Sequence, residues 1–212
     1  EKLLASKVKM VFTSNIKPSD LYMGGLQRKS FLSAISAIEN HCEIICLESV
    51  TDYRLRELEK SGIYFSPIDS EKMSSFNKLF QQLSKGANSG QSTIDILGRK
   101  IAFEDSANDI IHFSADVIFN SPRSSSDYIE LSREFHTIFI SNLNVIEEED
   151  TARRFIAFID ECYDRNVKVI FLSNPLPHEI YTGKRLPDKF QRTLSRLTEM
   201  QSNDYLQGRH KG

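Results

Sequence analysis

Cysteine is scarce in this chain, and its spacing excludes a disulfide framework. Three cysteines occur among 212 residues, at positions 42, 46 and 162. The stretch HCEIICLE predicts a strand from His41 to Leu47, in which four residues at about 3.3 Å each place the first two cysteines roughly 13 Å apart. Thiols that far apart cannot form a disulfide. We therefore expect small buried thiols in a reducing compartment, and no zinc or other metal site.

The chain also lacks long apolar runs and an excess of charge of either sign. No run approaches the roughly 20 apolar residues that a membrane-spanning helix needs. Lys and Arg number 27 against 29 Asp and Glu, a formal net charge of -2. This balance carries no nucleic-acid-binding or polybasic membrane-binding signature. With 40% hydrophobic and 26% charged residues, the composition is that of a folded α/β protein with no nucleic-acid partner and no transmembrane segment.

An apolar run that ends in polar residues opens the chain. Val8, Met10, Val11 and Phe12 are typical of a strand covered on both faces in a parallel sheet. The run stops at Thr13-Ser14-Asn15. In open α/β sheets ligands lie beyond the carboxyl ends of the strands, so a polar side chain at that tip is well placed to orient a water or a phosphate. The candidate for this role is Asn15.

A turn and a helix follow this strand. Pro18-Ser19-Asp20 favours a turn, and Gly24-Gly25 allows a sharp break before Arg28. The apolar residues between Phe31 and Asn40 recur on one helical face, so Arg28 is expected near a helix start. The strand predicted from residue 41 then completes a strand, helix, strand order, which fits the last part of a parallel nucleotide-binding sheet.

Eight segments of the chain together resemble the ZapE and AFG-one-like family of AAA+ ATPases. They are TSN (13–15), P-x-D-L-Y (18–22), GLQR (25–28), FLSAI (31–35), DYRLR (52–56), SDYIELSREFHT (126–137), ARRFIAFIDECYDRNVK (152–168) and QRTLSRLTEMQSNDYL (191–206). The resemblance runs from end to end. It departs at Ser33, where a proline is expected, and at Ser173-Asn174, where a Ser-Ala pair is more usual.

The resemblance implies a phosphate-binding loop, GxxxxGK[ST], and a strand ending in an acidic pair for Mg²⁺, both upstream of the first predicted strand. Neither occurs in these 212 residues. Gly183-Lys184 has His178 in place of the first loop glycine and Arg185 in place of the hydroxyl residue. Asp160-Glu161 lies among apolar residues with helical spacing, which predicts a helix. We expect the C-terminal half or more of a longer ATPase, whose upstream part makes the main contacts to ATP and Mg²⁺.

Arg54 and Arg56 follow the second predicted strand and are candidates for cofactor contacts. A planar guanidinium contacts phosphate bidentately better than an ammonium does. The alternative is that both arginines are solvated or pair with Glu57 and Glu59.

The closing helix, predicted over 187–201, carries Arg192 and Arg196 on one face, because residues four apart are neighbours on a helix. The resemblance favours one of them as a lid-borne arginine that reaches the nucleotide of the same subunit. The alternative is helix packing, with Glu199 as an ionic partner.

The middle of the chain predicts a helix, a linker and β structure. The helix Ser70–Ser84 carries Met73, Phe76, Leu79, Phe80 and Leu83 on one side. The polar stretch 85–93 with its two glycines predicts a mobile loop or a boundary. Residues 94–103 and 110–119 predict antiparallel strands. A helix follows over 124–135, with Ser124 or Ser125 as its cap, and His136 is expected to be a hydrogen-bonded structural residue.

The last third repeats the opening pattern at a constant offset of 159 residues, so that Ser173-Asn174 matches Ser14-Asn15. This predicts that strands 136–141 and 167–173 form a second βαβ-like unit, with Asn174 as a lookalike of Asn15 that has no site of its own. The expected class is α/β. Residues 1–57 end an AAA+-type parallel sheet, 58–93 form a helix and linker, and 94–212 form a mixed α/β region.

The function implied by the resemblance is ATP hydrolysis in bacterial cell division, in the cytoplasm or at the division site. The implied partners are FtsZ or other division-ring proteins, in an ATP-dependent homo-oligomer. Asn15 is expected to act within its own subunit and Arg28 on the γ-phosphate of a neighbour, where an arginine neutralises charge in the transition state. Without its phosphate loop, this chain alone is expected to be inactive. The competing hypothesis is an inert AAA+-derived adaptor that binds proteins.

Overall fold

The computed structural model describes residues 11–14, 17–21, 28–45, 53–85 and 90–212. The chain divides into two compact units, Glu1–Val50 and Thr51–Gly212. In its described part the first unit contains the short 3-10 helix η1 (Pro18–Asp20) and the helix α2 (Arg28–His41). The helix begins at Arg28 as predicted, and the 3-10 helix occupies the predicted turn.

The second unit is a sheet covered by helices on both faces. Its elements are α3 (Tyr53–Ser61), β1 (Tyr64–Phe65), α4 (Ser70–Ser84), β2 (Ser92–Ile96), β3 (Arg99–Phe103), β4 (Asp105–Ala107), β5 (Ile110–Ser114), the π-helix η2 (Asp116–Asn120), α5 (Ser125–Glu134), β6 (Thr137–Leu143), α6 (Glu149–Asp164), β7 (Lys168–Ser173), η3 (Pro177–Glu179), α7 (Pro187–Glu199) and α8 (Asn203–Gln207).

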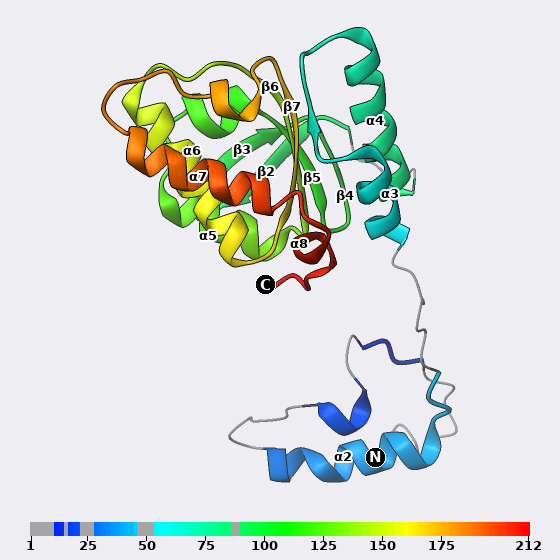
Figure 1. The fold of residues 1–212 in the computed structure, drawn as a ribbon. Coiled ribbons are helices and arrows are strands. Elements are labelled where there is room, and N and C mark those ends of the chain that lie inside the picture. Colours follow the sequence, from blue (N-terminus) through cyan, green and yellow to red (C-terminus); the bar gives the residue numbers. More distant parts are fainter. Residues whose placement is uncertain (1–10, 15–16, 22–27, 46–52, 86–89) are drawn as a thin grey trace. The chain divides into compact units, whose positions relative to one another are not determined.

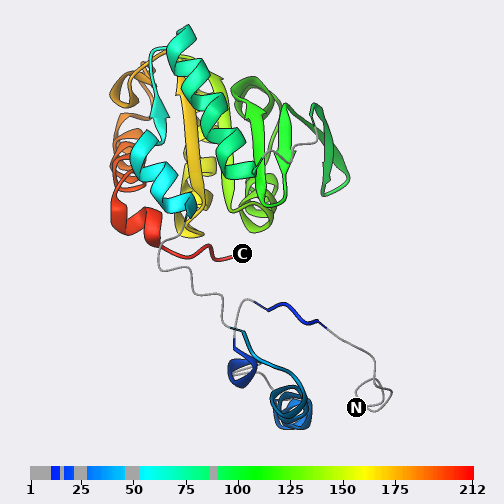
Figure 2. The same cartoon turned by 90° about the vertical axis from the view of Figure 1, so that its right-hand side faces the viewer.

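The main sheet has the order β1-β7-β6-β5-β4, in which only the β4–β5 pair is antiparallel. Helices α3 and α4 lie on one face, and α5, α6 and α7 lie on the other (Figures 1 and 2). After β1 at one edge of the sheet, the chain forms β4 at the opposite edge and then adds β5, β6 and β7 in turn, so that β7 lies next to β1. This arrangement confirms the α/β class.

Local sequence explains the best-defined helix, α4. Its bounds are those predicted, because Asp69 accepts a hydrogen bond from the Lys72 amide at 2.7 Å as an N-cap and Lys85 ends the helix in a left-handed conformation. Phe76 and Phe80 pack edge-on against Phe139 of β6. Met73, predicted on the same side, is 43% exposed and lies in the first turn of the helix.

The predicted second βαβ unit is confirmed. Strands β6 and β7 are parallel neighbours joined by α6, which contains Asp160 and Glu161 as predicted. All six residues of β7 are buried, as expected of a central strand in a parallel sheet. Helix α5 starts after Ser124, whose capping box with Asp127 confirms the predicted cap.

Two predicted strands of the first unit are wrong where the structure describes them. Val11 and Phe12 are 92% and 56% exposed and belong to no strand. The segment 43–45 after α2 is likewise exposed and not in a strand, and Cys42 directly follows the helix. An apolar run becomes a strand only beside another strand, and the described part of this unit provides none. Met10 and the residues before it, and Cys46 and Leu47, lie outside the described residues.

The antiparallel prediction is correct within 94–103, where β2 and β3 form a hairpin, whereas the antiparallel partner of β5 is β4, a strand that the sequence did not predict. The prediction is wrong beyond Ser114, because 116–120 form a π-helix where a strand was expected. Ser92 and Thr93, assigned to the linker, belong to β2, and residues 86–89 of the linker lie outside the described part. Among the described helices, none is both long and apolar enough to cross a membrane. The functional division at residues 57 and 93 stays a prediction.

Candidate functional site

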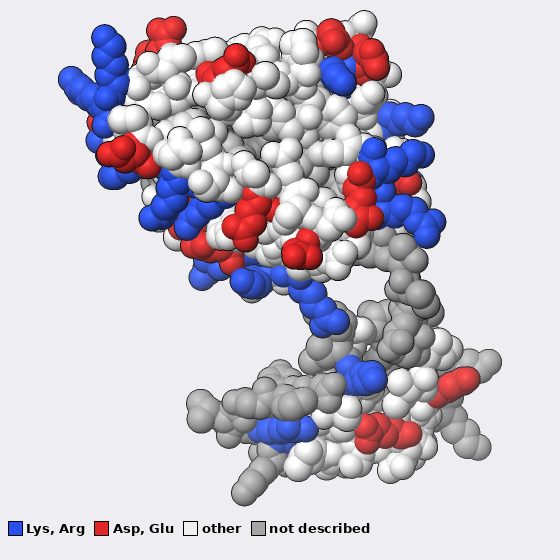
Figure 3. Space-filling model, in the orientation of Figure 1, with Lys and Arg blue, Asp and Glu red and all other residues white. Residues whose placement is uncertain are grey.

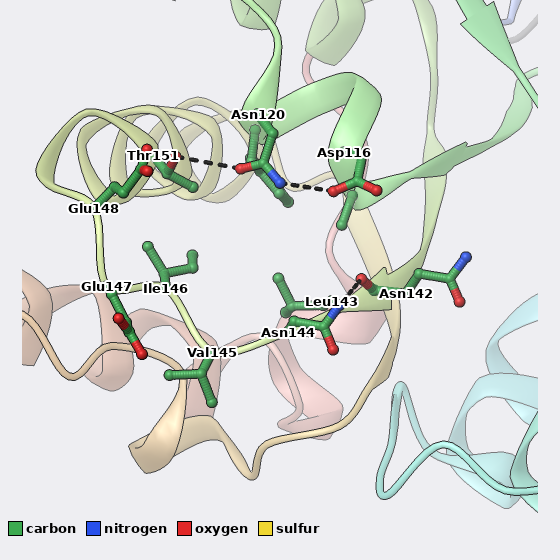
Figure 4. Close-up of a pocket in the computed structure, with 12 residues that line it drawn as sticks. Asp116, Asn120, Asn142, Leu143, Asn144, Val145, Ile146, Glu147, Glu148 and Thr151 are labelled. Atoms are coloured by element: carbon green, nitrogen blue, oxygen red, sulfur yellow. Dashed lines mark hydrogen bonds between the residues drawn. The ribbon is translucent and has the colours of Figure 1, made fainter.

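A pocket of about 420 Å³ lies beyond the carboxyl ends of β5 and β6 (Figure 4). Ligands of open α/β sheets bind at this edge, outside the ends of the parallel strands. The π-helix η2, the segment after β6 and the first turn of α6 form its walls, with these lining residues: Ala115, Asp116, Phe119, Asn120, Asn142, Leu143, Asn144, Val145, Ile146, Glu147, Glu148 and Thr151.

Hydrogen bonds hold one wall of this pocket together. The Asn120 amide donates to Asp116 at 2.6 Å and accepts from the Thr151 hydroxyl at 3.2 Å, which ties the π-helix to the start of α6. Arg154 reinforces the junction by donating to the Phe119 carbonyl. The wall is thus built by two elements that are 31 residues apart in sequence but joined by side chains.

A second network fixes the ends of β6 and β7. Strand β6 has an irregularity between Ile140 and Leu143, within which Asn142 adopts a left-handed backbone with φ of 59°. The Asn144 side chain donates to the Asn142 carbonyl at 3.2 Å and accepts from the Asn174 amide at 2.6 Å. Asn174, the predicted lookalike of Asn15, therefore lies at the carboxyl edge of the sheet and is engaged by a neighbouring amide.

The charge of the pocket is negative. Asp116, Glu147 and Glu148 line it, and the described lining includes no lysine or arginine. Such a surface disfavours a phosphate group and favours a cationic one. Within the described residues, no group of three or more His, Cys, Asp or Glu side chains is arranged to hold a metal ion. The pocket is a polar site at the expected edge of the sheet, without the cationic groups that a nucleotide requires.

The predicted catalytic pair belongs to the first unit. Asn15 lies outside the described residues. Arg28 is the first residue of α2, and its Nη2 donates to the Ser19 carbonyl at 2.8 Å. Its Nε is buried and forms no hydrogen bond within the described residues. The helix start and the turn are therefore held together by this guanidinium.

Arg54 and Arg56 diverge in the structure. Arg54 makes a bidentate pair with Asp109, with Nη1 and Nη2 at 2.7 and 2.8 Å from the two carboxylate oxygens. This contact joins α3 to the segment before β5 and lowers the pKa of Asp109 against the opposing effect of burial. Arg56 is exposed. Of the alternatives weighed from the sequence, an ion pair is correct for Arg54, but its partner is Asp109 and not Glu57 or Glu59.

Arg192 and Arg196 share one carboxylate. Both guanidiniums pair with Asp160 of α6, Arg192 at 3.3 Å, and Arg196 also lies 3.8 Å from Asp164. The Arg196 guanidinium stacks over the Tyr163 ring, 4.9 Å from its centroid. The predicted packing role is thus present, with Asp160 as the ionic partner in place of Glu199.

Comparison with known proteins decides the family. The family model described as AFG1-like ATPase matches residues 1–209. The chain belongs to the AFG1-like ATPase family. It is 41% identical over 210 residues to the cell division protein ZapE of Escherichia coli (strain K12), which covers 98% of this chain and 56% of that protein.

Two eukaryotic relatives extend the comparison. Lactation elevated protein 1 homolog B of Danio rerio is 29% identical over 242 residues, covering 97% of this chain and 48% of that protein. The uncharacterized protein C115.02c of Schizosaccharomyces pombe is 32% identical over 185 residues, covering 85% and 41%. The chain spans about half the length of the curated relatives it matches. No solved structure matches it.

This AFG1-like chain also contains a Ser–His contact that the sequence did not single out. His112 of β5 lies 2.9 Å from the Ser141 hydroxyl through Nε2 and packs edge-on against Phe76. Burial lowers the pKa of His112 to about 4, although Glu104 and Asp105 act in the opposite direction. His136 meets its prediction as a structural residue, with Nδ1 2.8 Å from the Thr137 hydroxyl. A neutral buried imidazole of this kind serves packing.

The sequence carries the same signal for this pocket as for Asn15, namely polar residues directly after a predicted strand. Asn15 follows a predicted strand, and Asn120 and Asn142 of the pocket follow the predicted strands 110–119 and 136–141 in the same way. The same rule, applied to every strand, selects two of the pocket residues. No such signal marks the acidic pair Glu147-Glu148 in the sequence, because acidic residues that line a pocket and acidic residues on a solvated surface have the same sequence pattern.

Proposed function

We propose that this chain works as the C-terminal part of an ATP-hydrolysing AAA+-type protein that acts in bacterial cell division. The observation that carries the proposal is the family match over residues 1–209, together with 41% identity to a protein named for cell division. The proposed setting is a homo-oligomer in the cytoplasm that is recruited to the FtsZ ring. The matched relatives are about twice as long, which leaves room in them for a phosphate loop and a magnesium-binding acidic pair.

In this proposal Asn15 orients the attacking water and Arg28 neutralises the γ-phosphate of a neighbouring subunit. One guanidinium nitrogen of Arg28 is engaged by the Ser19 carbonyl, which supports a pre-positioned side chain. A guanidinium has five N–H donors, so one such bond leaves capacity for phosphate oxygens. ATP and Mg²⁺ are held by upstream residues of the longer protein.

The arginines of the second unit favour another role. Arg54, Arg192 and Arg196 each pair with a carboxylate of the same chain. A phosphate must displace those carboxylates before it can use the arginines, at a cost that a solvent-facing arginine does not have. Their geometry supports a packing role for these arginines more than it supports three nucleotide contacts.

The Arg28→Ala variant of the longer protein separates the ATPase from the competing hypothesis, an inert AAA+-derived adaptor. We expect turnover to fall by at least about 10²-fold with ATP affinity nearly unchanged, because the contact forms mainly in the transition state. Arg133→Ala, at an exposed position of α5 paired with Glu130, is the matched control and should retain activity. If the longer protein does not hydrolyse ATP even without the substitution, that result supports the adaptor.

Mixing tests the action across subunits. Arg28→Ala protein combined with a phosphate-loop variant should recover part of the activity, because some interfaces then contain one intact arginine and one intact loop. No recovery at any ratio, despite demonstrated co-assembly, contradicts an arginine acting on a neighbour. The 212-residue chain alone should neither hydrolyse ATP nor bind it tightly, because it has no GxxxxGK[ST] loop.

A further inference from the structure

A second pocket, of about 220 Å³, lies at the opposite, amino-terminal edge of the parallel strands. His136 directly precedes β6 and Lys168 begins β7. Helix α3 supplies Arg54, and the segment after α8 supplies Arg209 and His210. All of these residues belong to the second unit, so the pocket lies within one compact body.

The lining of this pocket is basic. Five of its ten residues are arginine, lysine or histidine; Asp109 offsets the charge of Arg54 and the buried His136 is neutral, so Lys168 and Arg209 carry the net positive charge. Such a concave surface attracts anions, since low-dielectric walls concentrate the field of charges of one sign. The pocket at the other edge of the sheet is acidic instead. On the face of the molecule shown in Figure 3, basic and acidic side chains are interspersed.

The cations of this pocket are held by different means. Lys168 is buried and donates to the carbonyls of Asn166, Tyr205 and Gly208 at 3.1, 2.9 and 2.9 Å. It therefore contributes a fixed positive charge. Arg209 is exposed and forms no ion pair with an acidic residue of the described chain. Its guanidinium is the group best able to close on an incoming anion.

We propose that this pocket, in which the exposed Arg209 lies beside the buried charge of Lys168, binds a phosphate group. The volume is below the roughly 300 to 1,000 Å³ of sites that enclose a drug-sized ligand, so the occupant is a small oxyanion or the terminal phosphate of a larger molecule. An arginine matches a phosphate through two parallel N–H bonds. The site is separate from the proposed ATPase chemistry and does not depend on it.

Titration of the 212-residue chain with inorganic phosphate, followed by calorimetry and by amide NMR spectra, tests the proposal. We expect a Kd of about 1 mM or tighter at low salt, equivalent to about 4 kcal/mol. Amide shifts should change around His136 and Arg209. Adding ADP as a competitor distinguishes the sources of the group. Competition identifies a phosphate carried on a nucleotide, and its absence identifies the free oxyanion.

The Arg209→Gln variant should weaken phosphate binding at least about 10-fold with an unchanged Tm, because an exposed unpaired side chain contributes little to folding. Arg185→Gln removes the same charge at an 83% exposed position outside the pocket and should change the Kd less than about 2-fold. Equal weakening by both variants, shifts confined to other residues, or no binding overturns the proposal.

Discussion

Acid should destabilise the second unit through His112, and the substitution His112→Gln should remove that effect. The imidazole is buried between β5 and α4, next to Phe76 and Phe80. Its polar and charged neighbours are Ser141 on β6 and the carboxylates of Glu104 and Asp105. Burial lowers its pKa from 6.5 to about 4, so the folded protein keeps it neutral where the unfolded chain is protonated.

The sign and the size of the effect follow from linkage. Between pH 6.5 and about 4 the unfolded chain binds more protons at this histidine, so the free energy of unfolding falls as the pH falls. The full contribution is about 3 kcal/mol, since each pH unit of difference is worth about 1.4 kcal/mol. From pH 7 to pH 5 the loss is about 2 kcal/mol. His136, also lowered to about 4, adds a similar loss that remains in the variant.

Urea unfolding followed by circular dichroism at pH 7 and pH 5 measures the difference. Each protein serves as its own reference, so any packing cost of glutamine cancels. The loss between the two pH values should be about 2 kcal/mol smaller in His112→Gln than in the unmodified chain. The control His178→Gln, at a side chain that is 71% exposed, should leave the loss unchanged. Equal losses in all three proteins refute a neutral, buried His112.

Two further predictions concern stability, both measured by urea unfolding at pH 7. Lys168→Met should lower the free energy of unfolding by about 3–5 kcal/mol, because three carbonyls lose their hydrogen bonds to a buried ammonium. The control Lys100→Met, at an exposed strand position, should change the free energy of unfolding by less than about 0.5 kcal/mol. A loss below about 1 kcal/mol at Lys168 contradicts its role. Phe76→Ala should lower the free energy of unfolding by about 3–5 kcal/mol, and Met73→Ala, on the same helix, should lower it far less. Similar losses for the two variants contradict the packing of α4 against the sheet.

Local signals predicted the elements of the second unit well. Helix α4 has the predicted bounds because its apolar period and the polar, glycine-containing stretch that follows it both occur in the local sequence. The same holds for α5, with its Ser124 capping box, and for the β6–α6–β7 unit, whose strands are continuous apolar runs. Each of these signals acts between residues that are close in sequence, where the pattern alone carries the information.

Side-chain partners were not predicted, because they depend on packing between distant segments. The sequence offers Glu57 and Glu59, three and five residues away, as ionic partners of Arg54, but its partner in the structure, Asp109, is 55 residues away. Arg196 pairs with Asp160, 36 residues away, where Glu199 was the neighbour in sequence. The strands predicted at residues 8–12 and 41–47 fail in their described parts for a related reason. An apolar run needs a partner strand, and sequence pattern does not reveal whether one is adjacent.

The two edges of the parallel sheet differ in charge, and this difference bears on the repeat between Ser14-Asn15 and Ser173-Asn174. If Asn174 worked as a second phosphate sensor, the carboxyl edge of β7 would need cationic groups around it. Instead its amide is bonded to Asn144, and the pocket beside Asn144 presents Asp116, Glu147 and Glu148. Like charges at this edge repel a phosphate, whereas the basic groups gather around Lys168 at the other end of the strands. The second βαβ unit therefore has the form of a nucleotide-binding unit without its electrostatics, which favours a structural role for Asn174.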